Sequence, residues 1–280
     1  MQTVDAANIA GWLKVHLLPE PIAAIIAYSY EIELLNESVA LVFDCGVRTT
    51  QICVAKMMDN KIEILTNNED PFLGGNDFDA RLITYFSSAL KHKYGLNVLE
   101  TNKKYRLMYK CQEIKHTLSV ELKDNLYVDD FKVDEDDVIS IERKEFEEMA
   151  ADLILRAKHL IVESLRKAKL KRENINIVFQ VGGGCRMPMI KEMLKEMYPK
   201  AQHQCSIHPE EIVAKGAALY SYEIKSRNQI DSHVPKNIVI VKDDDHDVGD
   251  SHASVSSTEA NPENYHLKDE QQRNTRQLFS

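Results

Sequence analysis

IVFQVGGGCRMP, the sequence of residues 177–188, places a short apolar run directly before three glycines. A run of this length that ends at glycines is typical of a strand buried on both faces of a sheet. Residues 189–198 then carry apolar residues at helical spacing, so the stretch predicts a strand, a glycine-rich turn and a helix. Glycines let a backbone approach a ligand closely, and the N-terminus of a helix attracts negative charge, so this turn suits a nucleotide. The same glycines also fit a tight turn that holds no ligand.

The composition of the chain restricts the class of protein. Its net charge of −9 argues against a general binder of nucleic acids or of anionic membranes. The sequence has no run of about 18 apolar residues and no signal peptide, so we expect no membrane span, no secretion and a cytoplasmic location. The five cysteines are widely spaced and form no C-x-x-C pair, which speaks against a disulfide framework or a zinc site. We expect most of them to be small core residues.

Glu20 lies at the start of a predicted helix. Residues 1–16 look like an earlier helix, and prolines at positions 19 and 21 then interrupt the chain. Pro21 can open a helix over residues 21–28, because the first turn does not need the N–H that proline lacks. Glu20, just outside that turn, is either a charge that complements the helix dipole or a functional carboxylate.

Asp44 ends a second apolar run. Residues 39–44 predict a buried strand, and the polar turn after it leads into a hairpin whose own turn lies at Asp59 and Asn60. A strand, a polar turn and a returning strand together make a candidate phosphate loop. Asp44 either holds a metal-bound water there or caps the turn.

Two helices are predicted in the middle of the chain. Residues 72–77 lead into a helix whose buried face consists of Phe78, Leu82, Phe86 and Ala89. A second helix, at about residues 101–119, buries Leu107, Cys111, Ile114 and Leu118. It leaves Gln112, Lys115 and Ser119 on another face, where Lys115 and Ser119 are neighbours. Such a polar stripe is solvated surface unless a ligand lies against it.

The remaining elements are predicted from similar patterns. Residues 122–142 indicate short strands around an acidic loop, and residues 143–169 indicate one long amphipathic helix. A last helix covers residues 206–218, where Gly216 among alanines indicates close packing of backbones.

Five motifs occur in an order that resembles a known family. They are PEPIAA at 19–24, an apolar strand that ends in DCG at 44–46, LGGNDFD at 73–79, VGGGCRMP at 181–188 and PEEIVAKGAA at 209–218. In this order and at these separations they resemble the nucleotide-binding domain of the 70-kilodalton heat-shock chaperone family. The resemblance covers residues 2 to about 226, mainly the second lobe of that actin-like ATPase.

The resemblance implies an α/β fold and a division of the chain. Residues 1–37 would be a remnant of the first lobe with a crossing helix, and residues 38–228 the second lobe. Within the second lobe, a smaller α/β subdomain at about 71–142 would be inserted into a base subdomain of a sheet and helices. Residues 229–280 are polar and acidic, and we expect them to be disordered.

The resemblance also implies a site for ATP or ADP with Mg²⁺. Glu20 would lie near the metal and the attacking water, and Asp44 would be catalytic or would contact the metal through water. Gly46 and Thr49 would belong to a phosphate loop, and Gly74 and Gly75 would lie near the phosphates and the ribose. The positions implied for the adenosine end are Lys115, Ser119, Gly182, Gly183, Arg186 and Glu210.

The chain departs from the family pattern at several of these places. Val47 and Arg48 stand where the family has glycines, and Gln51 where it has a carboxylate. Side chains at 47 and 48 restrict the approach of the backbone to a phosphate, and Gln51 removes a negative charge from the metal environment. Gln112 and His116 replace a carboxylate and an arginine that help to frame the adenine. From the resemblance we expect the first lobe to be missing apart from the remnant at 1–37, and a peptide-binding domain to be missing as well.

Three functions remain open from these observations. The first is a chaperone-family protein that binds ATP or ADP, is linked to ATP-dependent protein folding and the stress response, and hydrolyses little by itself. The second is an active ATPase of the family, and the third is a degenerate interaction module that binds no nucleotide. We favour the first, with nucleotide-exchange factors or other co-chaperones as partners and with neither nucleic acid nor membrane bound.

Overall fold

The computed structural model of the chain describes most of its first 242 residues. The described ranges are 2–12, 14–32, 35–58, 61–132, 136–205, 211–228 and 240–242. They belong to one structural unit, Met1–Lys242. Glu210, Asp59 and Asn60, which the sequence singles out, lie outside the described residues.

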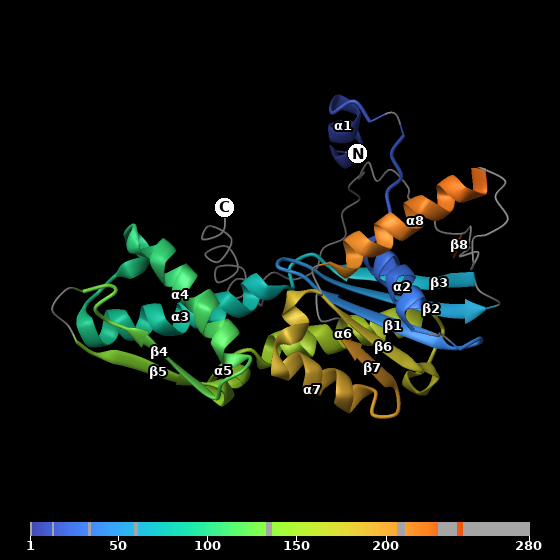
Figure 1. The fold of residues 1–280 in the computed structure, drawn as a ribbon. Helices are drawn as coiled ribbons and strands as arrows, with labels where there is room; N and C mark the ends of the chain where they lie inside the picture. The colour runs from blue at the N-terminus through green and yellow to red at the C-terminus, as the bar shows by residue number, and fades with distance from the viewer. Residues whose placement is uncertain are drawn as a thin grey trace, which may run out of the picture. The chain divides into compact units, whose positions relative to one another are not determined.

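A mixed sheet forms the centre of this unit, and β1 (Val39–Cys45) lies inside it (Figure 1). The strand order is β7-β6-β1-β2-β3-β8. β1 runs parallel to β6 and antiparallel to β2, β6 runs parallel to β7, and β3 runs antiparallel to β2 and parallel to β8. The other bounds are β2 Thr50–Met58, β3 Lys61–Asp70, β6 Ile177–Val181, β7 Gln202–Cys205 and β8 Ile240–Lys242. β1 and β6 are buried along their whole length, as their apolar sequences predict.

Helices cover both faces of the sheet, as Figure 1 shows. On one face lie α2 (Glu20–Glu31) and α8 (Ile212–Asn228), and on the other lie α6 (Ala151–Lys167) and α7 (Pro188–Met197). The core under α2 includes a stacked ring pair, Tyr28 and Phe179, whose centroids are 4.3 Å apart. These two layers hold the ends of β1 and β6 in a fixed environment.

α2 and α8 touch through their backbones at Gly216. A Cβ atom at that position would lie 1.8 Å from the carbonyl oxygen of Ala23, far inside van der Waals contact. The close packing that the sequence predicts at Gly216 is therefore confirmed. The contact fixes the point along α2 at which α8 crosses it.

A smaller group of elements follows β3 along the chain. It consists of α3 (Gly75–Tyr94), the 3₁₀ turn η1 (Val98–Glu100), α4 (Lys103–Leu118), and the antiparallel pair β4 (Lys123–Tyr127) and β5 (Val138–Glu142). α3 packs on α4, and α4 packs on β4. The chain then returns through α5 (Arg143–Met149) to α6 and the main sheet. The buried residues predicted for α4, Leu107, Cys111, Ile114 and Leu118, are confirmed.

Some element boundaries differ from the sequence prediction. α1 covers only Gln2–Ile9, because Gly11 takes a positive φ of 86°, and residues 12 and 14–19 have no regular structure. The single helix predicted for 143–169 is wrong: α5 and α6 are separate, since Ala150 between them has φ −98° and ψ 5° and so leaves the helical conformation. Short 3₁₀ turns, η2 Arg172–Asn174 and η3 Gly183–Arg186, flank β6. Within the described ranges, no helix is both long enough and apolar enough to span a bilayer.

Cysteine positions agree with the sequence prediction. Cys45, Cys53, Cys111 and Cys185 are buried, and Cys205 is exposed. Burial raises the pKa of the Cys45 thiol to about 11 and that of the Cys53 thiol to about 12. These thiols therefore stay protonated at neutral pH and act as small core side chains.

Candidate functional site

The carboxyl ends of β1 and β6 place Asp44 beside the glycine turn. The two strands are parallel, and Asp44 lies opposite Val181, the residue before Gly182. Gly182 has a φ of 80°, and a Cβ there would lie 2.3 Å from the carbonyl oxygen of Cys45. A Cβ at Gly184 would lie 2.3 Å from the Cys45 sulfur. Packing against β1 thus requires these two glycines with or without a ligand.

Gly183 differs from its two neighbours. No atom lies within 4 Å of the position where its Cβ would be, and the residue is exposed. The chain continues directly into η3, in which Arg186 is also exposed, before α7 begins at Pro188. The predicted helix after the turn is therefore preceded by a 3₁₀ turn. Of the three glycines, Gly183 is the one beside which the structure leaves space for a ligand.

Asp44 is buried beside this turn, and one of its carboxylate oxygens accepts no hydrogen bond from the described residues. Asp44 is 5% exposed, and its Oδ2 atom has no hydrogen-bond partner among the described residues. Burial, and next the charge of Glu20, raises the pKa of the Asp44 carboxyl to about 6. Glu20 is exposed and is the first residue of α2, where its charge also favours the helix dipole. The two carboxylates therefore share one electrostatic environment.

This carboxylate pair fits Mg²⁺ better than it fits a closed metal cage. Across the described ranges, no three His, Cys, Asp or Glu side chains gather in a way that could hold a metal ion. Proteins commonly hold Mg²⁺ through one or two carboxylates together with phosphate oxygens and waters. Asp44, whose Oδ2 has no hydrogen-bond partner among the described residues, and Glu20 are the two carboxylates that would hold Mg²⁺ in this way.

The loop between β1 and β2 is tied to the start of α3. The Gly46 N–H donates to the Thr49 carbonyl at 2.9 Å, and Thr49 is half-buried. The Gly46 carbonyl accepts from the Gly75 N–H at 3.0 Å, and the Val47 carbonyl accepts from the Asn76 N–H at 2.8 Å. The first N–H groups of α3 are thus engaged by this loop.

Gly74 shows how close the loop and the helix come. A Cβ at Gly74 would lie 2.5 Å from the carbonyl carbon of Arg48, so the two backbones touch. The Gly74 N–H donates to Asp77 Oδ2 at 2.8 Å, which caps the helix. The side chain of Val47 points away from these contacts, since the residue is 68% exposed.

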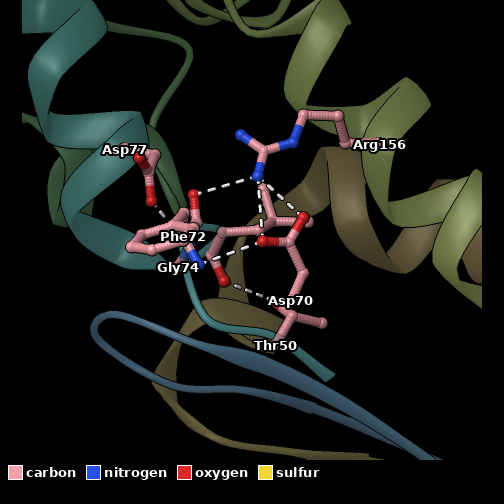
Figure 2. Close-up of polar contacts among 7 residues, drawn as sticks. Thr50, Asp70, Phe72, Gly74, Asp77 and Arg156 are labelled. Carbon is pink, nitrogen blue, oxygen red and sulfur yellow. Dashed lines mark hydrogen bonds and ion pairs between the residues drawn. The ribbon is translucent and has the colours of Figure 1, made fainter. Parts of the chain in front are cut away.

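Arg156 of α6 holds the segment that leads into α3 (Figure 2). One guanidinium nitrogen donates to both carboxylate oxygens of Asp70, at 2.9 and 2.7 Å, and to the Phe72 carbonyl at 3.2 Å. On the other side, the buried Thr50 hydroxyl donates to the Leu73 carbonyl at 2.7 Å. Residues 70–74 are therefore anchored to both α6 and β2, which fixes where α3 begins.

Lys115 is buried, so at this residue the polar stripe is not the solvated surface that was one of its two interpretations. Its ammonium donates to Asp79 Oδ2 of α3 at 2.8 Å and to the Gly75 carbonyl at 3.2 Å. Gln112 is exposed, and the Ser119 hydroxyl donates to the Lys115 carbonyl of its own helix at 3.0 Å. Burial raises the pKa of the Asp79 carboxyl, and the Lys115 charge partly offsets that effect. The stripe does not form one surface.

Several predicted residues thus meet around the end of β1. Asp44 adjoins Gly182, Gly46 adjoins Gly75, and Gly75 adjoins Lys115. Asp79 and Arg156 are residues that the sequence did not single out. Asp79 carried a signal, because it lies four positions after Gly75 on the same helical face; Arg156, within an ordinary amphipathic helix, carried none.

Comparison with known proteins supplies the family. The family model described as "Hsp70 protein" matches residues 1–238. The chain belongs to the Hsp70 family. Its sheet and helices fit the actin-like ATPase lobe of Hsp70 proteins, which confirms the fold that the five motifs imply.

Individual Hsp70 relatives match over the same region. The stromal 70 kDa heat shock-related protein of Spinacia oleracea, a chloroplastic protein, is 34% identical over 222 residues, which is 78% of this chain and 37% of that protein. The heat shock cognate HSP70 protein of Trypanosoma brucei brucei is 32% identical over 224 residues, which is 79% of this chain and 33% of that protein. The chain thus spans about a third of the length of these curated Hsp70 relatives.

Proposed function

We propose that this Hsp70-family chain binds ATP or ADP at the carboxyl ends of β1 and β6. The observation that carries the proposal is the open space beside Gly183, on the turn that follows the buried parallel strand β6 and whose first glycine, Gly182, adjoins Asp44. In α/β folds, ligands bind outside the carboxyl ends of parallel strands. The family match supports an adenine nucleotide as that ligand.

The adenosine end of the nucleotide provides most of the binding in this proposal. Gly183 is exposed on the turn with open space at its Cβ position, and Arg186 is exposed on the same turn. The N–H groups of Gly74 and Gly75 already bond to Asp77 and Gly46, so they add little at the phosphate end. ADP and ATP, which differ in one phosphate, therefore bind with similar affinity.

We further propose that hydrolysis by this chain is slow. Mg²⁺ would be held through Asp44 and Glu20, and it supplies charge neutralisation of the phosphates when bound. Phosphoryl transfer depends on positioning and on charge stabilisation around the phosphates. Val47 and Arg48 add side chains to the loop, and Gln51, which lies opposite Asp44 across β1 and β2, brings no charge. The chain holds few groups that stabilise the transition state.

In the cell, we propose a role linked to ATP-dependent protein folding and the stress response. Nucleotide-exchange factors or other co-chaperones are the proposed partners, and the cytoplasm is the proposed location. The support is the family of the chain and the α/β lobe that its described residues form.

Calorimetric titration with Mg-ADP and Mg-ATP tests the binding proposal. We expect both to bind with affinities within about fivefold of each other, because one phosphate is worth little where its donors are engaged. Gly183→Leu fills the open space and should weaken both by about tenfold or more. Thr84→Leu, at an exposed position of α3, introduces the same side chain away from the turn and is the matched control. Absence of heat with either nucleotide would support the interaction module instead, and a large preference for ATP would contradict the adenosine-end assignment.

Phosphate release tests the hydrolysis proposal. The parent chain should release phosphate from ATP no faster than an Asp44→Ala variant, since the remaining groups of the site do not position an attacking water. A parent rate clearly above background that collapses in Asp44→Ala would restore the active ATPase.

A further inference from the structure

A buried ion pair joins the two helices that follow the main sheet. The Lys115 ammonium on α4 lies 2.8 Å from Asp79 Oδ2 on α3, and the side chains are 10% and 8% exposed. Of the three N–H bonds of the ammonium, one points to Asp79 and another to the Gly75 carbonyl. Burying two charges is unfavourable unless geometry and further hydrogen bonds compensate, so the presence of the pair is weak evidence that it stabilises the fold.

The ion pair connects through hydrogen bonds to the loop between β1 and β2. Gly75, whose carbonyl accepts from Lys115, donates its own N–H to the Gly46 carbonyl at 3.0 Å. Asn76, the next residue, donates to the Val47 carbonyl, and the Gly46 N–H closes the loop on Thr49. A Cβ at Gly75 would lie 3.3 Å from Lys115 Nζ and 3.7 Å from the Gly46 oxygen. The ammonium is therefore two hydrogen bonds from the loop, across a crowded contact.

The charge of Lys115 also acts on the carboxyl end of β1, where Asp44 lies. Burial raises the pKa of the Cys45 thiol to about 11, and the Lys115 charge acts in the opposite direction on that thiol. Cys45 is the last residue of β1 and lies between Asp44 and Gly46. The Lys115 charge thus reaches the strand end at which the site is built.

We infer that Lys115 and Asp79 are positioning residues, whose ion pair holds the first turn of α3 against the β1–β2 loop and so sets the shape of that loop. The part of the inference that concerns nucleotide binding rests on the proposed function. The part that concerns the shape of the loop holds for the protein without nucleotide. It differs from the adenosine contact that the family resemblance implies for Lys115. The ammonium already donates to Asp79 and to the Gly75 carbonyl, and the side chain is nine-tenths buried, so little of it faces a ligand.

Hydrogen exchange without nucleotide tests the positioning of the loop. Asp79→Asn and Lys115→Met should each speed exchange of the Gly46, Gly75 and Asn76 amides by about tenfold or more, since these hydrogen bonds open when the contact loosens. Asp152→Asn breaks the ion pair of Asp152 with Arg81, which also ends on α3 but is largely exposed, and should leave these amides unchanged. Unchanged exchange in Asp79→Asn and Lys115→Met would overturn the inference.

A double variant separates positioning from the penalty of an unpaired charge. Lys115→Met combined with Asp79→Leu removes both charges, and apolar replacement of a buried pair is often neutral for stability. We expect the melting temperature to recover toward that of the parent while the loop amides still exchange about tenfold faster. If their exchange also returns to the parent value, the pair only stabilises the fold, and the inference is wrong.

Titration with Mg-ADP then separates positioning from direct contact. If the pair acts through the loop, Asp79→Asn and Lys115→Met weaken ADP binding by similar factors, and the double variant is no weaker than either. If Lys115 contacts the nucleotide, Lys115→Met weakens binding while Asp79→Asn, which frees the ammonium, does not, and the inference fails. If the parent chain binds no nucleotide, only the proposed function is contradicted. Hydrogen exchange without nucleotide still decides whether the ion pair positions the loop.

Discussion

The two turns on either side of Asp44 achieve their shape by different means. The turn after β6 depends on glycines, because Gly182 and Gly184 lie against Cys45 with no room for a side chain. The loop after β1 has kept one glycine, Gly46, and is shaped by hydrogen bonds from the start of α3. The shape of the first turn depends on the absence of side chains at its glycines. The shape of the second depends on hydrogen bonds that the N–H groups of α3 donate to it. Substitution should therefore damage the first turn far more than the second.

The largest effect is expected at Gly182. Gly182→Ala places a Cβ 2.3 Å from the Cys45 carbonyl at a φ of 80°, so strain and overpacking add. We expect the free energy of unfolding to fall by about 4 kcal/mol, as measured by urea denaturation.

Gly183→Ala is the matched control for that comparison. Nothing lies within 4 Å of its Cβ position, so the loss should stay below about 1 kcal/mol. Equal losses at both positions would show that the close approach of the turn to β1 does not govern its stability.

An effect of intermediate size is expected at Asp44. Its pKa is about 6 in the folded chain against an ordinary 3.8, so the native state binds more protons between these values and stability falls as the pH rises through them. Asp44→Asn removes this titration and should stabilise the chain by about 2–3 kcal/mol above pH 6, with little gain near pH 4. Urea midpoints at several pH values measure the difference.

Glu69→Gln serves as the control for the pH series. Glu69 is an exposed carboxylate on β3, so its replacement controls for the loss of a surface charge. A pH profile of Asp44→Asn that runs parallel to the parent profile would mean that Asp44 is not the group whose charge opposes folding.

The smallest effect is expected in the β1–β2 loop. Val47→Gly removes a side chain that is 68% exposed and leaves the carbonyl that accepts from Asn76 in place. The loss of unfolding free energy should be below about 1 kcal/mol, mostly from added freedom of the unfolded backbone. A loss as large as that of Gly182→Ala would remove the distinction between the two turns.

The sequence predicted the strands of the site well and the reasons for its glycines poorly. Residues 39–43 are all apolar, and residues 177–181 are apolar except for Gln180, which is typical of buried central strands, and both strands lie where predicted. Gly182 and Gly184 were equally compatible with a ligand or with a tight turn. The choice depended on Cys45, which lies more than a hundred residues away in the sequence.

Lys115 shows a second limit of prediction from one helix at a time. The spacing of α4 correctly gave its apolar stripe, but the polar residues beside a stripe are buried or exposed according to the neighbouring helix. Asp79 on α3 supplies the partner that makes burial of the ammonium possible. The break at Ala150 had no local signal either, because alanine fits a continuous helix.

Gly216 lies at a contact where a compensating substitution on the partner helix is not possible. Most overpacked positions can be relieved by a smaller residue on the partner helix, and this allows pairs of sites to drift together. Here the atom that a Cβ would strike is the main-chain oxygen of Ala23, 1.8 Å away, and every amino acid carries that oxygen. No exchange at position 23 can compensate for a side chain at position 216. Among homologous chains that keep this helix crossing, glycine should persist there even where the residues facing it vary freely.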